Sequence, residues 1–157
     1  FDRDGLIARS GTVDAELLAS LDALPFYSQT GAKSLGREWV EKEIFPMIDS
    51  RRLEFADLLS TFTEHAVRQV ARVVRRVGKP HPTMLITGGG ALNVYLVERI
   101  RELAGCEVKI PPRQIIEFKE ALIFAFLGSL YMAGEASCLS SVTGAACDNI
   151  GGMLFKI

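Results

Sequence analysis

Residues 83–93, "TMLITGGGALN", decide the fold that this sequence predicts. An apolar run ends in three glycines, and the helix-like pattern "NVYLVERIREL" follows at residues 93–103. A second apolar run, "CEVKI" at residues 106–110, comes next and stops at two prolines. The pattern therefore predicts a short buried strand, a helix and a second strand, which together form a βαβ-like unit.

The residues before this unit have helical periodicity. Leucines at helical spacing predict a helix over residues 14–23, with Thr12 or Asp14 as its cap. Residues 37–48, "REWVEKEIFPMI", predict another helix that Pro46 kinks or ends.

A third helix is predicted over residues 54–77 and ends at Gly78. Its arginines are interpreted as a solvated helix face rather than a nucleic-acid surface. Those arginines are Arg68, Arg72, Arg75 and Arg76. The apolar stripe expected to be buried consists of Phe55, Leu58, Leu59, Phe62, Ala66, Val70, Val73, Val74 and Val77.

The last part of the chain adds one long apolar segment. Residues 117–134, "EFKEALIFAFLGSLYMAG", predict a largely buried helix, and residues 141–145 and 151–157 predict a loop and a last strand. The fold class is α/β in one domain, mainly helical over residues 1–80 and βαβ-like over residues 83–157. Because α/β sheets usually have about four to six strands, this sheet is expected to be incomplete.

Composition excludes several classes of protein. The 157 residues carry a net charge of −1, so no excess charge indicates a nucleic acid or an anionic membrane as partner. No apolar run reaches membrane-spanning length, and we expect a cytoplasmic protein. The three cysteines and two histidines lack metal-ligand spacing, and no metal site is assigned. The chain begins with Phe1, which suggests a piece of a longer polypeptide.

The glycine run Gly88, Gly89 and Gly90 lies where a strand is predicted to turn into a helix. Such a turn presents free backbone N–H groups to an anion or a nucleotide, and its missing Cβ atoms allow close approach. The alternative is that the glycines only serve a tight turn and helix–strand packing. The residues that follow do not fit a P-loop or a dinucleotide fingerprint, which argues against NAD as the ligand.

Five motifs occur together along the chain. They are "FDRDGLIARSG" (1–11), "AKSLGREW" (32–39), "TGGGALN" (87–93), "KEALIFAFLG" (119–128) and "SVTGA" (141–145). In this order and spacing they resemble the C-terminal part of anhydro-N-acetylmuramic acid kinases, which belong to the actin-like (ribonuclease H-like) ATPase and sugar-kinase superfamily. The resemblance implies a helix-rich C-terminal lobe of that fold.

The resemblance also implies a reaction. ATP, with Mg²⁺, phosphorylates 1,6-anhydro-N-acetylmuramic acid at O6 while water opens the anhydro ring, giving N-acetylmuramic acid 6-phosphate in cell-wall recycling. Gly88, Gly89, Gly90 and Asn93 match the turn that lies against the nucleotide. The family's catalytic aspartate and its "GTS-x-DG" phosphate segment lie upstream of the matching residues. The chain alone is therefore expected to be inactive. Whether it forms a homodimer is left open by the sequence.

Two further motifs imply sugar contacts, and each has a structural alternative. Glu120 matches an acidic residue expected to face the sugar pocket, but a glutamate in the first turn of a helix is also stabilised by the helix dipole. The "KSLGRE" residues would contact substrate or form a capping and ion-pair network that fixes their loop. Those residues are Lys33, Ser34, Arg37 and Glu38.

The sequence also leaves open a function that is not enzymatic. The chain would then be a non-catalytic nucleotide-binding or assembly module of a related protein. An intact upstream aspartate and phosphate segment would favour the enzyme, and their loss would favour the module.

Overall fold

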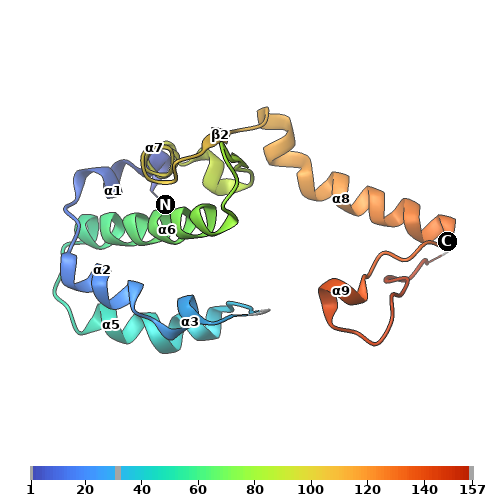
Figure 1. The fold of residues 1–157 in the computed structure, drawn as a ribbon, viewed down its shortest axis with the longest axis horizontal. Helices are drawn as coiled ribbons and strands as arrows, with labels where there is room; N and C mark the ends of the chain where they lie inside the picture. Colours follow the sequence, from blue (N-terminus) through green and yellow to red (C-terminus); the bar gives the residue numbers. More distant parts are fainter. Residues whose placement is uncertain (1, 31–32, 156–157) are drawn as a thin grey trace. The chain divides into compact units, whose positions relative to one another are not determined.

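The computed structural model describes residues 2–30 and 33–155. The chain divides into two compact units, Phe1–Pro111 and Pro112–Ile157 (Figure 1). The first unit holds most of the helices and a sheet of two strands, and the second holds helices α8 and α9. The helix-rich α/β class is confirmed, while the actin-like lobe and the single domain stay predictions. Within the described residues, no helix is long and apolar enough to cross a membrane.

Helix α6, Phe55–Val77, is the centre of the first unit. It follows Glu54 and ends at Gly78, whose φ of 63° is the left-handed conformation that favours glycine at a helix end. Helices α1 (Leu6–Ser10) and α7 (Val94–Leu103) pack on one side of it, and α2 (Ala15–Asp22) on the other. The predicted bounds of this helix are confirmed.

The predicted apolar stripe of α6 is buried only in part: Leu58, Phe62, Val70 and Val74 pack against the apolar clusters described below. Phe55, Val73 and Val77 of the apolar stripe are 62%, 59% and 54% exposed. The buried residues are Ser60, Thr61, Glu64, His65, Val67 and Ala71. The cause is that Asp22 of α2, the Tyr27 hydroxyl and Arg99 of α7 bring hydrogen-bonding partners to this face, so polar side chains can be buried without losing their hydrogen bonds.

Helix α2 confirms its prediction and identifies its cap. The Asp14 side chain accepts a hydrogen bond from the backbone N–H of Leu17 at 2.6 Å, which is the N-cap arrangement. Arg51 donates to the same carboxylate at 3.2 Å. Thr12 does not cap this helix; its own N–H donates to Asp57 on α6 at 2.7 Å.

A turn of π-helix lies before Pro46. Helix α3 (Pro25–Ser28) precedes α4 (Arg37–Trp39), the π-helical turn Val40–Ile44 and α5 (Phe45–Asp49). The N–H of Phe45 bonds to the carbonyl of Val40, five residues back, so the helix widens where proline would otherwise clash with the preceding turn. The helix therefore continues through Pro46 and does not end there.

The predicted βαβ-like unit is confirmed. Strands β1 (Thr83–Leu85) and β2 (Glu107–Lys109) pair in parallel, with Thr83 opposite Glu107 and Leu85 opposite Lys109, and α7 lies between them in sequence. The sequence overestimated how far the strands are buried. The side chains of these two residue pairs are exposed, and only the middle residue of each strand, Met84 or Val108, faces the helices. Met84 and Val108 pack on the cluster described next.

Two apolar clusters lie along α6. The first contains Leu17, Leu21, Leu24 and Ile44, with Leu58 and Phe62 of α6 packed against it. The second contains Val67, Ala71, Ile100 and Ala104, and the two strands pack against it. The second cluster therefore fixes β1 and α7, the two elements that flank the glycine run.

The second unit contains α8 (Arg113–Ala133) and α9 (Ser140–Thr143). The prediction that its long helix is largely buried is wrong, since no residue of α8 is buried and Phe124 is 71% exposed. Residues 151–155 form no strand; Cys138 and Asn149 instead form an isolated antiparallel bridge. Residues 156 and 157 of the predicted last strand lie outside the described residues.

Candidate functional site

The glycine run forms a separate turn between β1 and α7. Gly88 has φ 77° and ψ −173°, and a 3-10 turn follows over Gly89–Leu92. The N–H of Ala91 donates to the carbonyl of Gly88 at 3.0 Å. As the first residues of the turn, Gly89 and Gly90 have N–H groups without an acceptor inside it. Helix α7 begins after Asn93, as the pattern over residues 93–103 predicted, so the glycines lie in the turn between the strand and the helix.

Packing within the chain does not explain why residues 88 and 89 are glycines. A Cβ atom added to either would meet no atom within 4 Å, and one added to Gly90 would make an ordinary contact with Leu96 at 3.8 Å. The positive φ of Gly88 requires glycine on backbone grounds. Gly89 has neither a positive φ nor a close neighbour, so the described chain gives no reason for its missing side chain.

Asn93 has a structural part in this turn. Its Oδ1 accepts a hydrogen bond from the Leu96 N–H at 3.0 Å and so caps α7. Its own N–H donates to the carbonyl of Gly90 at 3.2 Å, which ties the helix cap to the glycine turn. The side-chain oxygen is therefore engaged in the cap, and the amide NH₂ group is the part of Asn93 that remains for a ligand.

Thr87 stands immediately before the glycines. Its Oγ1 is buried and has no hydrogen-bond partner among the residues that the structure describes. A buried hydroxyl without a partner costs roughly 1–3 kcal/mol, so each such group needs an explanation. The residue with the unsatisfied hydroxyl thus directly precedes the glycines over which the chain leaves space.

The "KSLGRE" segment shows local contacts. Lys33 donates to the carbonyl of Phe26 at 2.8 Å and lies 4.6 Å from the centre of its ring. Arg37 pairs with Glu41 at 2.6 Å, one helical turn away. These contacts agree with the alternative in which the charged residues fix their own loop. Ser34 and Glu38 are exposed, and substrate contact by this segment stays a prediction.

Glu120 lies in the second unit, on α8, and is exposed. The helix begins at Arg113, so Glu120 is two turns from its start and the alternative based on the helix dipole is wrong. That alternative assumed a helix starting near residue 117. The structure does not place Glu120 relative to the glycine turn, because the two belong to different units.

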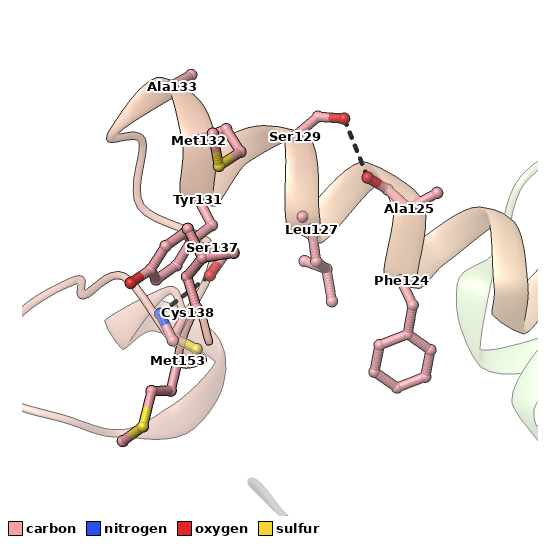
Figure 2. A pocket seen from close by; sticks show the side chains of 14 residues that line it. Phe124, Ala125, Leu127, Ser129, Tyr131, Met132, Ala133, Ser137, Cys138 and Met153 are labelled. Carbon is pink, nitrogen blue, oxygen red and sulfur yellow. Dashed lines mark hydrogen bonds between the residues drawn. The ribbon is translucent and has the colours of Figure 1, made fainter. Parts of the chain in front are cut away.

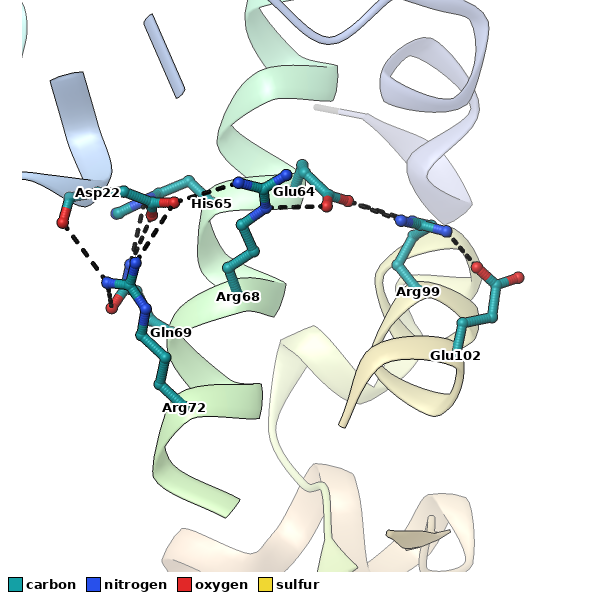
Figure 3. Close-up of polar contacts among 8 residues, drawn as sticks. All are labelled: Asp22, Glu64, His65, Arg68, Gln69, Arg72, Arg99 and Glu102. Carbon is teal, nitrogen blue, oxygen red and sulfur yellow. Dashed lines mark hydrogen bonds and ion pairs between the residues drawn. The ribbon is translucent and has the colours of Figure 1, made fainter. Parts of the chain in front are cut away.

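A buried polar network on α6 was not predicted from the sequence (Figure 3). His65 is 5% exposed, and its Nδ1 lies 2.8 Å from Asp22 Oδ1. Since a carboxylate only accepts, Nδ1 carries the proton and Nε2 accepts from the Tyr27 hydroxyl at 2.9 Å. Gln69 donates to the same Asp22 oxygen at 2.7 Å, and Arg68 reaches the other oxygen at 3.4 Å.

The titration of His65 follows from this environment. Burial lowers the pKa of His65 below its usual 6.5, although the hydrogen bond to Asp22 acts in the opposite direction; the charges of Arg72 and Arg68 lower it further. Burial and the charge of Asp22 raise the pKa of Tyr27 above its usual 10.0. His65 is therefore neutral at pH 7 and acts as a structural link between α2, α3 and α6.

Glu64 forms the other half of the network in Figure 3. It is 8% exposed and accepts hydrogen bonds from Arg99 of α7 at 2.8 Å and from Arg68 at 3.2 Å. Arg99 also pairs with Glu102. Arg68 and Arg72 keep 45% and 40% of their side chains exposed on this solvated face, but both also pair with Asp22, which the sequence did not predict. The sequence signal for this network was the presence of polar residues four positions apart on the helix, such as Glu64 and Arg68.

The second unit contains an apolar cavity of about 1050 Å³. Figure 2 shows Phe124, Leu127 and Tyr131 extending from α8, and Met153 from the segment after α9 that also lines the cavity. The hydroxyl of Ser137 accepts from the N–H of Gly151 at 3.1 Å and joins the two chain segments that form its far wall. Glu120 does not line this cavity.

Comparison with known proteins identifies the family. The model of the family described as anhydro-N-acetylmuramic acid kinase matches residues 1–156. The chain is 36% identical over 167 residues to a protein named anhydro-N-acetylmuramic acid kinase from Variovorax paradoxus, and 35% identical over 159 residues to one from Xanthomonas oryzae pv. oryzae. A protein of that name from Sulfurimonas denitrificans is 32% identical over 170 residues.

These similarities cover nearly all of this chain but less than half of each relative. They span 99% of the chain in all three cases, and 43%, 42% and 45% of the Variovorax, Xanthomonas and Sulfurimonas proteins. The match thus runs from residue 1 through the glycine turn to α8 and beyond. The chain belongs to the anhydro-N-acetylmuramic acid kinase family.

Proposed function

We propose that this chain is the C-terminal part of an ATP-dependent kinase acting on 1,6-anhydro-N-acetylmuramic acid. The γ-phosphoryl group of ATP is transferred to O6 of the sugar, water adds at the anomeric carbon, and the bond between that carbon and O6 breaks. The product is N-acetylmuramic acid 6-phosphate. Family membership and the names of the relatives support this reaction.

The observation that carries the nucleotide part of the proposal is the open space over Gly88 and Gly89. A nucleotide lying against this turn explains why residue 89 has no side chain, which the chain itself does not. The N–H groups of Gly89 and Gly90 would donate to nucleotide oxygens. The amide NH₂ of Asn93 would add a donor.

We assign Glu120 to the sugar. An exposed carboxylate on a rigid helix accepts hydrogen bonds from sugar hydroxyls or orients the attacking water, which is a positioning role. Its freedom from local pairs supports this assignment: within the described residues no hydrogen bond or ion pair of Glu120 is found, whereas Glu117, one turn earlier, pairs with Arg113 at 2.5 Å. Ser34 and Glu38 are proposed as further substrate contacts, with Lys33 and Arg37 holding their loop.

Mg²⁺ enters the proposal with ATP. No group of three or more His, Cys, Asp or Glu side chains that could hold a metal ion occurs among the described residues. The set of ligands in this chain therefore does not fit a complete Mg²⁺ site, and phosphate oxygens would supply most of the ligands. A cytoplasmic location and a homodimer remain part of the proposal.

The nucleotide assignment is tested by adding side chains of increasing size at residue 89 of the full natural polypeptide that carries this chain. Gly89→Ala is expected to weaken ATP binding several-fold and Gly89→Val at least tenfold, because the Cβ substituents fill the space needed by the ligand. Isothermal titration measures the affinity, and circular dichroism checks folding. Unchanged affinity for ATP in both folded variants would refute a nucleotide at this turn.

The sugar assignment is tested by Glu120→Gln with Glu117→Gln as its matched control. Both changes remove one carboxylate charge from the same exposed stretch of α8, but only Glu120 is placed at the sugar. Glu120→Gln is expected to lower sugar-dependent ADP release at least tenfold, with a change in melting temperature similar to that of the control. Equal turnover in the two variants would exclude the role of Glu120.

A further inference from the structure

The DRDG turn, residues 2–5, packs directly on the start of α7. Gly5 has φ 73°, and a Cβ atom at this position would lie 2.3 Å from Asn93 Oδ1 and 2.7 Å from Tyr95 Cβ. Glycine is thus required twice, by the left-handed backbone and by the contact with α7. Substitution by any other residue must push on Asn93, on Tyr95 or on the turn itself.

The turn is held in place from both sides. Asp2 accepts hydrogen bonds from the N–H groups of Ile7 at 2.8 Å and Ala8 at 3.0 Å, which fixes the turn to α1. From α1, the Arg9 guanidinium lies 4.9 Å from the centre of the Tyr95 ring and pairs with Glu98. Residues 2–9 therefore contact three side chains in the first two turns of α7.

Helix α1 is itself fixed on α6. A Cβ atom on Gly11, at its end, would lie 2.1 Å from the carbonyl oxygen of Ala56 in the first turn of α6. Such close backbone approach, made possible by glycine, leaves α1 little freedom to slide. The DRDG turn is thus supported by the central helix of the unit while it presses on the cap of α7.

Asn93 connects the DRDG turn with the glycine turn. Its side chain touches Gly5 and caps α7, and its N–H is bonded to the carbonyl of Gly90. We propose that Gly5 and the DRDG turn are positioning elements: they hold Asn93, and through it they fix the N–H groups of Gly88–Gly90 in the orientation that the nucleotide needs. This inference rests on the nucleotide binding proposed above for the same turn.

The test compares two glycines that flank the same helix. Gly5→Ala adds a Cβ atom against Asn93, whereas Gly105→Ala, just beyond the C-terminal end of α7, adds one where no atom lies within 4 Å. Both positions have left-handed φ, 73° and 65°, so both variants bear the same kind of backbone strain. The variants differ in the contact with the start of α7, which Gly5→Ala makes with Asn93 and Tyr95 and Gly105→Ala does not.

Two measurements on the full natural polypeptide decide the outcome. Both variants are expected to melt at a lower temperature, but only Gly5→Ala should raise the Kd and KM for ATP at least fivefold while the KM for the sugar stays within twofold. Without ATP, amide hydrogen exchange of residues 88–96 should quicken in Gly5→Ala and not in Gly105→Ala. Equal ATP affinity and equal exchange in the two variants would overturn the positioning role.

A second variant covers the case in which Gly5→Ala does not fold. Asp2→Asn adds no bulk but leaves only one acceptor for the two N–H groups of α1, and it is expected to weaken ATP binding twofold to fivefold. ATP affinity unchanged by Asp2→Asn would count against the proposal. If Gly89→Val leaves the ATP affinity intact, the proposal of a nucleotide at the glycine turn is refuted. If Gly89→Val weakens ATP binding but Gly5→Ala behaves as Gly105→Ala does, only the positioning role is refuted.

Discussion

The polar face of α6 and the glycine turn lie in the same unit, yet their polar groups are used in opposite ways. On α6, the buried Glu64 and His65 have partners on both sides. At the glycine turn, the hydroxyl of Thr87 lacks a partner among the described residues, and the space above Gly89 is unfilled by the chain. Of these two regions, as far as the described residues show, the glycine turn is the one with space and donors left for a ligand.

The difference shows why buried charge alone does not locate a site. His65 bonded to Asp22 and Tyr27 resembles a catalytic arrangement, but both ring nitrogens are engaged inside the fold and the ring is buried. Partners in α2 and α3 hold it, so it stabilises the unit. Ligand sites are expected instead where donors and space remain after the chain has formed its own contacts.

The largest effect on stability is expected for Glu64→Ala. It leaves Arg68 and Arg99 without their shared carboxylate, and removing one partner of a buried pair costs several kcal/mol. Because both arginines are partly exposed, we expect a loss of about 2 kcal/mol in the free energy of unfolding, measured by urea titration. Glu41→Ala, which breaks the exposed pair with Arg37, is the control and should cost less than about 1 kcal/mol.

A smaller loss is expected for His65→Phe. The ring volume is kept, but the hydrogen bonds to Asp22 and Tyr27 are lost, which should cost about 1–2 kcal/mol. A double-mutant cycle with Tyr27→Phe measures the coupling of the two side chains. Additive losses would show that the Tyr27 hydrogen bond contributes nothing to the network and would weaken the contrast with the glycine turn.

Stability should also depend on pH through the same two residues. Because the pKa of folded His65 lies below 6.5, the unfolded chain binds the proton first, and stability should fall as the pH drops from about 6.5 toward the folded value. The slope from this residue stays below about 1.4 kcal/mol per pH unit. The raised pKa of Tyr27 predicts a second loss above pH 10. The acid slope should be smaller in His65→Phe, and an unaltered slope would contradict its assignment to His65.

The sequence predicted features that depend on neighbouring residues. The bounds of α6, the Asp14 cap and the order of β1, α7 and β2 follow from periodicity, cap residues and glycines. It did not predict that polar residues of α6 are buried, because His65 depends on Asp22, which is 43 residues away from it in the chain. The start of α8 at Arg113 was missed, although Ile115 and Ile116 in its first turn continue the apolar pattern of the helix.

The candidate site divides in the same way. The position of the glycine turn could be predicted, since a glycine run after a strand marks a backbone that needs freedom or space. The packing of Gly5 against the Asn93 side chain could not be predicted, because these residues are far apart in sequence. They meet only when α1 packs on α7. Whether Glu120 approaches the glycine turn is likewise a property of the folded chain and not of its motif.

The smallest effect on stability is expected at the site itself. Gly89→Ala adds a methyl group that meets no atom within 4 Å, at a position without positive φ, so the free energy of unfolding should change by less than about 0.5 kcal/mol. Replacing glycine also reduces the conformational freedom of the unfolded chain, which favours the folded state slightly. If packing alone had selected this glycine, the same change would cost well over 1 kcal/mol. Urea titration without nucleotide therefore separates the two explanations: a large loss assigns Gly89 to the fold, and a negligible loss together with weaker ATP binding assigns it to the ligand.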